Sequence, residues 1–297
     1  MSKHIFWIAS YPKSGNTLLR AILSSLFFSN DGKFDFTLLK PINTFENKYR
    51  LNFIKNTNQN DFNSLHKLDI LSKYWHDIQS KSNLGFEEDM GFLKTHHALV
   101  KYENKSFASE NNSRGFIYII RDPRDVVISW SHHAKISIDQ SINFVTNELS
   151  ATQWNESNKS ILNKNNNSLV IVSSWEKNIL SWTENKWHCP KLILRYEDLV
   201  YDKVNSIISI SEYFVKNFNF NFPNLDQKIE NIVKSTNFTK LKENEKKIGF
   251  NEATNGPFFR VGKKNQWKEK LNNSQLKLIE NKFKKTMINF GYNLSEK

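Results

Sequence analysis

The sequence predicts an α/β protein with a central, mainly parallel sheet that is flanked by helices. Two observations support this prediction. Short apolar runs, typical of strands buried on both faces, alternate along the chain with segments whose apolar residues recur at helical spacing. Polar motifs follow several of these runs directly, and the carboxyl ends of parallel strands are where such sheets bind ligands.

The first unit runs from a strand through a polar turn into a helix. Residues 5–9 form a continuous apolar run that suits a buried strand. A polar turn follows at 11–16. Beyond it, apolar side chains recur at the three- and four-residue spacing of an amphipathic helix, at Leu19, Ile22, Leu23, Leu26 and Phe27.

Three further strands are expected, at 92–94, 115–120 and 192–194. Residues 30–90, between the first helix and the second strand, are polar and aromatic and predict loops and short helices. An asparagine run at 165–167 predicts another loop.

A helix is expected directly after the third strand. Asp122 is a good N-cap, Pro123 suits the first helical position, and Asp125 places a carboxylate in the first turn. A later stripe, at Trp175, Ile179, Trp182 and Lys186, has the same helical spacing.

A last helix is expected near the end of the chain. Ser274 can cap its start and Gly291 can end it. Its apolar stripe consists of Leu276, Ile279, Phe283, Met287 and Phe290. The alternating phenylalanines over 214–222 are read as packing residues.

Composition excludes several classes of protein. The single cysteine, Cys189, excludes an internal disulfide and a cysteine zinc cluster. The net charge of +12 comes from scattered lysines, which indicate a solvated surface rather than a nucleic-acid stripe. The short apolar run near the start is too short for a signal peptide and no run is long enough to span a membrane, so we expect a cytoplasmic protein of one domain, residues 1–297.

The first motif, at 10–17, reads Ser-Tyr-Pro-Lys-Ser-Gly-Asn-Thr and joins the first strand to the first helix. Backbone N–H groups at a helix N-terminus bind phosphate oxygens, while Lys13 adds a positive charge and Ser14 and Thr17 add donors. It is not the nucleoside triphosphate P-loop, because Trp7 and Pro12 fill the positions where that loop has glycine.

The second motif, at 121–129, begins with Arg-Asp-Pro-Arg-Asp and ends with Ser129. Arg121 leaves the third strand just as the helix starts. An arginine and the hydroxyl of Ser129, converging at this strand end, predict a second anion site. Asp122, Pro123 and Asp125 are read as residues that only build the helix start.

These two motifs, in this order and spacing, resemble the cytosolic sulfotransferases and their bacterial relatives. The resemblance implies a P-loop-like three-layer fold whose donor is 3′-phosphoadenosine 5′-phosphosulfate and whose product is 3′,5′-bisphosphoadenosine. The first loop would then hold the 5′-phosphosulfate, and the second would hold the 3′-phosphate.

Further segments extend the resemblance to about residue 292. They are 93–96 (Leu-Lys-Thr-His), 195–198 (Arg-Tyr-Glu-Asp), 236–238 (Thr-Asn-Phe), and 259–262 with 267–268 (Phe-Arg-Val-Gly and Trp-Lys). The resemblance implies that the donor is bound by Lys13, Ser14, Gly15, Asn16, Thr17, Leu18, Arg121, Ser129, Tyr196, Thr236, Phe238, Arg260, Val261 and Gly262.

Three positions depart from the family pattern. Leu18 stands where many members have a tryptophan that stacks on adenine, Asn16 replaces a threonine, and Val261 replaces a lysine. We therefore expect Phe238 and Tyr196 to provide more of the adenine contact.

The resemblance also implies roles in an in-line transfer of the sulfuryl group to a hydroxyl or amine of a small acceptor. His96 would be the general base, in keeping with the pKa range of histidine. Lys13 would stabilise the leaving group, in keeping with its positive charge. Lys94 would add charge at the same centre. Ser129 would bind the 3′-phosphate and hold Lys13 until the acceptor arrives.

His96 is chosen over His97 because it matches the family segment, and because neighbouring side chains on a strand point to opposite faces. The other histidines, including His132 and His133, are read as structural. No magnesium site of the Walker type and no His/Cys cluster is visible, so no metal is expected.

Two alternatives are a P-loop kinase, which the missing glycines oppose, and a basic nucleic-acid-binding protein, which the scattered lysines oppose. Residues 31–90 and 134–165 are expected to shape the acceptor pocket, since they fill the gaps between the donor motifs. The sequence indicates neither the identity of the acceptor nor the oligomeric state.

Overall fold

The structure is a computed structural model, and it describes residues 3–46, 48–84, 90–152, 169–250, 252–253 and 256–295. The asparagine run at 165–167, predicted as a loop, lies outside the described residues.

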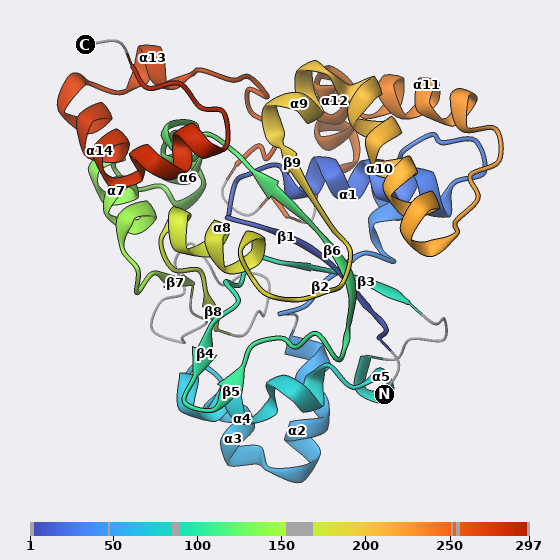
Figure 1. The fold of residues 1–297 in the computed structure, drawn as a ribbon, viewed down its shortest axis with the longest axis vertical. Helices are drawn as coiled ribbons and strands as arrows, with labels where there is room; N and C mark the ends of the chain where they lie inside the picture. The colour runs from blue at the N-terminus through green and yellow to red at the C-terminus, as the bar shows by residue number, and fades with distance from the viewer. Residues whose placement is uncertain are drawn as a thin grey trace.

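A parallel sheet forms the centre of the molecule (Figure 1). Its order is β2 (Asn43–Thr44), β3 (Gly91–Thr95), β1 (Ile5–Ser10), β6 (Ser113–Ile120) and β9 (Lys191–Arg195). Every neighbouring pair is parallel, which confirms the predicted sheet. The chain leaves β1 toward β2 and β3 on one side, then continues to β6 and β9 on the other, so β1 and β6 flank the place where a ligand site is expected.

The residues of β1 divide between two cores, one on each face of the sheet. Ile5, Trp7 and Ala9 pack into one core, which includes side chains from helices α8 (Trp175–Thr183) and α14 (Asn273–Asn289). Phe6 and Ile8 pack into the other, with helices α1 (Asn16–Phe28), α10 (Lys203–Phe218) and α11 (Leu225–Ser235). This arrangement confirms three layers and explains why the strand has no polar face.

The remaining elements are mostly short. As predicted, the described residues between 30 and 90, which are 30–46, 48–84 and 90, lie mostly in loops and short helices, and α2 to α5 gather below the sheet in the view of Figure 1. These elements are η1 (Phe36–Leu39), η2 (Lys48–Leu51), α2 (Asn52–Thr57), α3 (Gln59–Asn63), α4 (Leu68–Ile78), α5 (Lys81–Leu84), β4 (Lys101–Tyr102), β5 (Lys105–Ser106), α6 (Pro123–Ala134), α7 (Ile138–Thr146), β7 (Ala151–Thr152), β8 (Val170–Ile171), α9 (Tyr196–Tyr201), α12 (Phe238–Ile248) and α13 (Trp267–Lys270).

The predicted helix ends are partly confirmed. The Asp122 side chain caps α6 by accepting from the Arg124 N–H, and Pro123 is the first helical residue. The predicted cap of α14, Ser274, is wrong. The Asn272 side chain instead accepts from the Gln275 N–H, and the Gln275 side chain accepts from the Asn272 N–H. These two bonds complete a capping box, which explains why Asn272 is the cap. Gly291, just beyond this helix, has a left-handed φ of 76°.

The predicted packing role of the phenylalanines at 214–222 is confirmed, because Phe214 and Phe222 lie in the core beside α1. Within the described part of the chain, no helix combines the length and the apolar character that crossing a membrane requires.

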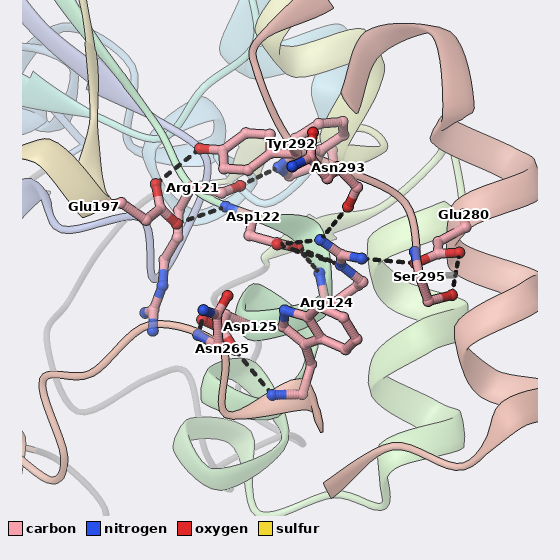
Figure 2. A network of polar contacts seen from close by, with 12 residues as sticks. Arg121, Asp122, Arg124, Asp125, Glu197, Asn265, Glu280, Tyr292, Asn293 and Ser295 are labelled. Carbon is pink, nitrogen blue, oxygen red and sulfur yellow. Dashed lines mark hydrogen bonds and ion pairs between the residues drawn. The ribbon is translucent and has the colours of Figure 1, made fainter. Parts of the chain in front are cut away.

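Arg124 joins α6 to the C-terminal region through a buried network of charges (Figure 2). Its guanidinium pairs with Asp122 at 2.6 Å and with Glu280 on α14 at 2.6 Å, and it donates to the Asn293 carbonyl at 3.0 Å. It also lies 3.8 Å above the centre of the Trp267 ring. One side chain therefore fixes the start of α6 against two distant parts of the chain.

We predict that Arg124→Ala lowers the free energy of unfolding by about 3–5 kcal/mol, because it leaves two buried carboxylates without their counter-charge. Urea unfolding measures the change. Lys234→Ala is the control: it breaks the exposed pair with Glu230 on α11 and should leave the unfolding midpoint unchanged. Equal effects of the two variants would contradict the assignment.

Candidate functional site

The loop between β1 and α1 has a backbone that depends on left-handed residues. Lys13 has a φ of 65° and Gly15 has a φ of 99°. A Cβ atom on Gly15 would lie 2.4 Å from Cδ2 of Tyr196, so only glycine lets the loop approach this ring. The loop is thereby pressed against the end of β9, which Tyr196 follows.

The start of α1 is open toward this loop. Gly15 is the N-cap and offers no side chain, so the first backbone N–H groups of α1 have no capping partner. The Ser14 hydroxyl, which can donate, is buried without a hydrogen-bond partner among the described residues. A buried donor of this kind is costly unless something accepts from it, so this end of α1 suits an anion with several oxygens.

Asn16 fixes the loop from within. Its Nδ2 donates to the Ile8 carbonyl at 3.1 Å and to the Ser10 hydroxyl at 3.1 Å. The side chain therefore bridges the end of β1 and the first turn of α1. A threonine, the residue usual in the resembling family, has no amide that could donate twice in this way.

Arg121 connects the two predicted anion loops. Its Nη1 donates to the Lys13 carbonyl at 2.9 Å, and its guanidinium lies 4.3 Å from the centre of the Tyr196 ring. Its Nε is buried and has no partner among the described residues. Arg121 thus has donor capacity left for a ligand at the point where the ends of β1, β6 and β9 meet.

The predicted contact between Ser129 and Lys13 is not formed within the described residues. Ser129 is half-buried on α6. Lys13 instead places its ammonium group 4.4 Å from the centre of the Phe258 ring. An aromatic face stabilises a cation without a hydrogen bond, which keeps the ammonium group available.

A carboxylate that the sequence did not suggest lies among these cations. Glu252 accepts a hydrogen bond from the Thr17 hydroxyl at 3.1 Å and forms an ion pair with Arg20, both on α1. Burial alone would raise the pKa of Glu252, but Arg20, Lys94 and the Thr17 hydroxyl lower it to about 2. No motif marks this residue, because its partners are more than 230 positions away in the chain.

Burial and neighbouring charges control the two lysines. Burial and the charge of Arg121 lower the pKa of Lys13 to about 8, while Glu252 opposes this shift. Burial likewise lowers the pKa of Lys94, which Glu252 also opposes. Glu252 therefore favours the protonated form of both ammonium groups when no other anion is bound, and Glu46 does the same for Lys94.

His96 faces the loop through a defined nitrogen. Its Nδ1 lies 2.8 Å from the Ser10 carbonyl oxygen, which can only accept, so Nδ1 carries the proton and Nε2 keeps its lone pair. Burial and then the charge of Lys94 hold the pKa of His96 well below its usual value of 6.5. The ring is therefore neutral at physiological pH and can accept a proton at Nε2.

His97 points into the core. Its ring stacks on Phe107 with the centroids 3.9 Å apart, and it meets Trp75 edge to face. It is almost fully buried, and burial lowers its pKa to about 3. The two adjacent histidines therefore face different environments, although both lie just beyond β3, which ends at Thr95.

His133 is predicted to be structural. It is half-buried on α6, and its ring tilts against Trp130 at 5.6 Å. Burial and the charges of Lys13 and Lys94 lower its pKa to about 3, so it lies near the same cations.

The segments predicted to contact the adenine also meet at this end of the sheet. Phe238 begins α12, and Gly262 approaches it so closely that a Cβ there would lie 2.1 Å from Cδ2 of Phe238. Leu18 packs in the same apolar cluster as Phe238. Thr236 differs: its hydroxyl donates to the Ile232 carbonyl at 2.7 Å and accepts from Lys203 at 3.2 Å, so it is occupied within the protein.

Arg260 and Val261 lie on the segment that follows α12. Arg260 is exposed, and its Nη2 donates to Gln266 Oε1 at 3.2 Å. Burial and then the charge of Arg121 lower the pKa of Arg260. The Arg260 guanidinium therefore lies within the electrostatic influence of Arg121. Val261 is half-buried between Arg260 and Gly262.

The described part of the chain contains no group of three or more His, Cys, Asp or Glu side chains that could hold a metal ion.

The Sulfotransferase domain family model matches residues 3–291. The amine sulfotransferase of Oryctolagus cuniculus is 28% identical over 189 residues, which cover 61% of this chain and 57% of that protein. The luciferin sulfotransferase of Photinus pyralis is 25% identical over 240 residues, which cover 80% of this chain and 56% of that protein. The chain thus spans a little over half the length of these curated relatives.

Two solved structures share the fold. A mouse sulfotransferase complexed with PAP has a TM-score of 0.58 and 16% identity, and the match covers 97% of this chain and 85% of that chain. Retinol dehydratase in a complex with retinol and PAP has a TM-score of 0.59 and 19% identity, covering 100% of this chain and 84% of that chain.

We predict that Glu252→Gln lowers the pKa of Lys13 below about 8, because Glu252 is the negative charge that keeps Lys13 protonated. The measurement is the pH dependence of Lys13 labelling by an amine-reactive reagent, followed by mass spectrometry. The pH of half-maximal labelling should fall.

Glu243→Gln is the control. Glu243 is an exposed glutamate on α12 that pairs with Lys240 at 3.6 Å. This variant should leave the labelling profile of Lys13 in place. A profile that moves upward in Glu252→Gln would show that Glu252 does not hold the proton on Lys13.

Proposed function

Because the chain belongs to the sulfotransferase domain family, we propose that it transfers a sulfuryl group from 3′-phosphoadenosine 5′-phosphosulfate to a hydroxyl or amine of a small acceptor. The observation that carries this proposal is the contact between Arg121 and the Lys13 carbonyl at 2.9 Å. It brings two anion-binding loops together at one end of a parallel sheet, and a donor with separate anionic groups at its 5′ and 3′ positions needs two such loops.

The donor fits the unsatisfied groups of the site. We assign the 5′-phosphosulfate to the open N-terminus of α1, where Ser14 has a buried hydroxyl without a partner. We assign the 3′-phosphate to Arg121, Ser129 and Arg260. Proteins commonly bind phosphate groups at a helix N-terminus beside a lysine, and they also bind them with arginines.

We assign the adenine to the aromatic surface beside these loops. Tyr196 and Phe238 supply the rings, and Leu18 adds an apolar contact in place of the tryptophan that many family members have. A Cβ atom would clash with Tyr196 at Gly15 and with Phe238 at Gly262, so both glycines place backbone directly against these rings. This close packing supports the assignment. Thr236 supports the adenine site through its backbone position rather than its hydroxyl, which is already bonded within the protein.

His96 is proposed as the general base. Its neutral ring, with the proton on Nδ1 directed at the Ser10 carbonyl, leaves Nε2 to accept the proton of the acceptor hydroxyl. The transfer is in line: the acceptor oxygen attacks sulfur as the bridging oxygen of the bisphosphate departs. Lys13 stabilises the charge on that departing oxygen, and Lys94 adds a second positive charge nearby.

We propose no metal in this reaction, because the ammonium groups of Lys13 and Lys94 supply the positive charge. The relatives named amine sulfotransferase and luciferin sulfotransferase support a small-molecule acceptor. We further propose that residues 1–297 work as one cytoplasmic sulfotransferase domain, which the family match over 3–291 supports.

We predict that the protein binds 3′,5′-bisphosphoadenosine far better than adenosine 5′-phosphate, because each charge-assisted hydrogen bond to the 3′-phosphate contributes about 1.5–3 kcal/mol. Arg121→Ala should erase most of this preference. Titration calorimetry with both nucleotides measures it. Equal affinities of the unaltered protein for the two nucleotides would contradict the assignment of the 3′-phosphate site.

Thermal shift with three ligands separates the proposal from its alternatives. Only bisphosphoadenosine should raise the melting temperature strongly, since a ligand that binds the native state stabilises it. Stabilisation by ATP with magnesium instead would indicate a kinase, and stabilisation by duplex DNA would indicate a nucleic-acid-binding protein.

We predict that His96→Ala lowers single-turnover transfer about 10²–10⁴-fold, the usual loss for a positioned general base, while binding of bisphosphoadenosine stays nearly normal. His97→Ala should mainly lower stability, because it removes the ring stacked on Phe107. The acceptor should be an aliphatic alcohol, whose hydroxyl needs a base. Inactive His97→Ala beside active His96→Ala would move the base assignment to the other histidine.

A further inference from the structure

Asp125 is a fully buried carboxylate that bonds to the backbone of residues 256–267, a segment that we call the strap. Its Oδ2 accepts from the Asn265 N–H at 2.8 Å and its Oδ1 accepts from the Trp267 N–H at 3.1 Å (Figure 2). Trp267 is buried beneath the Arg124 guanidinium, which keeps this end of the strap in place. Burial raises the pKa of Asp125 to about 6 and the charge of Arg121 opposes this shift, so the carboxylate that holds the strap lies near that arginine.

The strap residue between these two bonds reaches Arg260. Gln266 follows Asn265 directly, and its Oε1 accepts from Arg260 Nη2 at 3.2 Å. A connected series of contacts therefore runs from the Asp125 carboxylate through the strap backbone to the Gln266 amide and the Arg260 guanidinium. Arg260 is otherwise exposed, so this series limits where its guanidinium lies.

The two arginines at the end of this series favour an anion between them. Arg121 acts on Arg260 strongly enough to lower its pKa, together with burial. Arg121 Nε is also buried without a partner among the described residues. Two like charges held close together are stabilised when an anion accepts hydrogen bonds from both.

We propose that Asp125 is a positioning residue for the 3′-phosphate of the donor, which it serves by holding Arg260, through Gln266, where both arginines contact one phosphate. This inference rests on the proposed function and adds a determinant of donor selectivity to it. Asp125 touches neither donor nor acceptor, and it acts only through the strap.

A purely structural role for Asp125 makes a different prediction. If the carboxylate only fastened the strap to α6, its loss would lower the melting temperature and weaken both nucleotides equally. If Asp125 has a positioning role, its loss weakens the binding of the nucleotide that carries a 3′-phosphate and leaves the binding of the other nucleotide unchanged. The ratio of the two affinities is therefore the readout, because a general loss of stability does not move it.

The test is calorimetric titration of Asp125→Asn with 3′,5′-bisphosphoadenosine and with adenosine 5′-phosphate. The amide replaces one accepting oxygen by a donor, which cannot bond to a backbone N–H. We expect bisphosphoadenosine to bind about tenfold more weakly, the loss that one displaced charge-assisted hydrogen bond produces, with no change for adenosine 5′-phosphate. In an Arg260→Ala background the same substitution should cause no further loss, since coupled residues are not additive.

Asp139→Asn is the matched control, because Asp139 is also a first-turn carboxylate, on α7, and within the described residues its side chain bonds to Gln275. It should leave both affinities unchanged. Gln266→Ala, which breaks the series without touching the core, should reproduce the selective loss and serves if Asp125→Asn does not fold.

Equal affinities for the two nucleotides in the unaltered protein would overturn the proposed function and, with it, this inference. A normal preference in the unaltered protein that persists in Gln266→Ala and in any folded Asp125→Asn would overturn the inference alone. Equal weakening of both nucleotides would also overturn it, in favour of a structural role.

Discussion

The hydrogen bond from Arg121 to the Lys13 carbonyl is the interaction on which the site depends. Arg121 directly follows β6, and Lys13 belongs to the loop after β1. The parallel pairing of these two strands, from Phe6 with Gly115 to Ser10 with Ile119, brings both strand ends to the same edge. Since Arg121 also stacks on Tyr196 beyond β9, one guanidinium organises three neighbouring strand ends.

Concentrating positive charge at this edge has a cost that the rest of the molecule offsets. Burial and the charges of Arg121 and Lys94 lower the pKa of Lys13 to about 8. Glu252 supplies the compensating negative charge through its contacts with α1. A carboxylate in this position stabilises the cations before an anionic ligand arrives, and it explains how a buried lysine can remain protonated.

The structure places the C-terminal part of the chain on top of this edge through contacts of several kinds. Glu245 and Asp125 each accept two backbone N–H groups from the segment after α12. Arg124 then fixes the start of α6 against α14 through Glu280. The residues that surround the site therefore come from segments far apart in the chain, from the loop after β1 to the segment after α12, and buried polar contacts rather than continuous secondary structure hold them together.

Local features of the sequence determined the fold class and predicted most residues of the candidate site. Apolar runs identified four strands and polar motifs identified the ends of β1, β3 and β6, because burial on both faces and helix capping leave clear patterns over a few neighbouring residues. Tertiary structure alone decided the remaining features. β2 has only two residues and no pattern of its own, so only its pairing with β3 defines it. The surroundings of Glu252, His133 and Asp125 are formed by residues far away in the chain. The spacing of residues along the sequence does not indicate which distant charge a carboxylate or an imidazole will contact after folding.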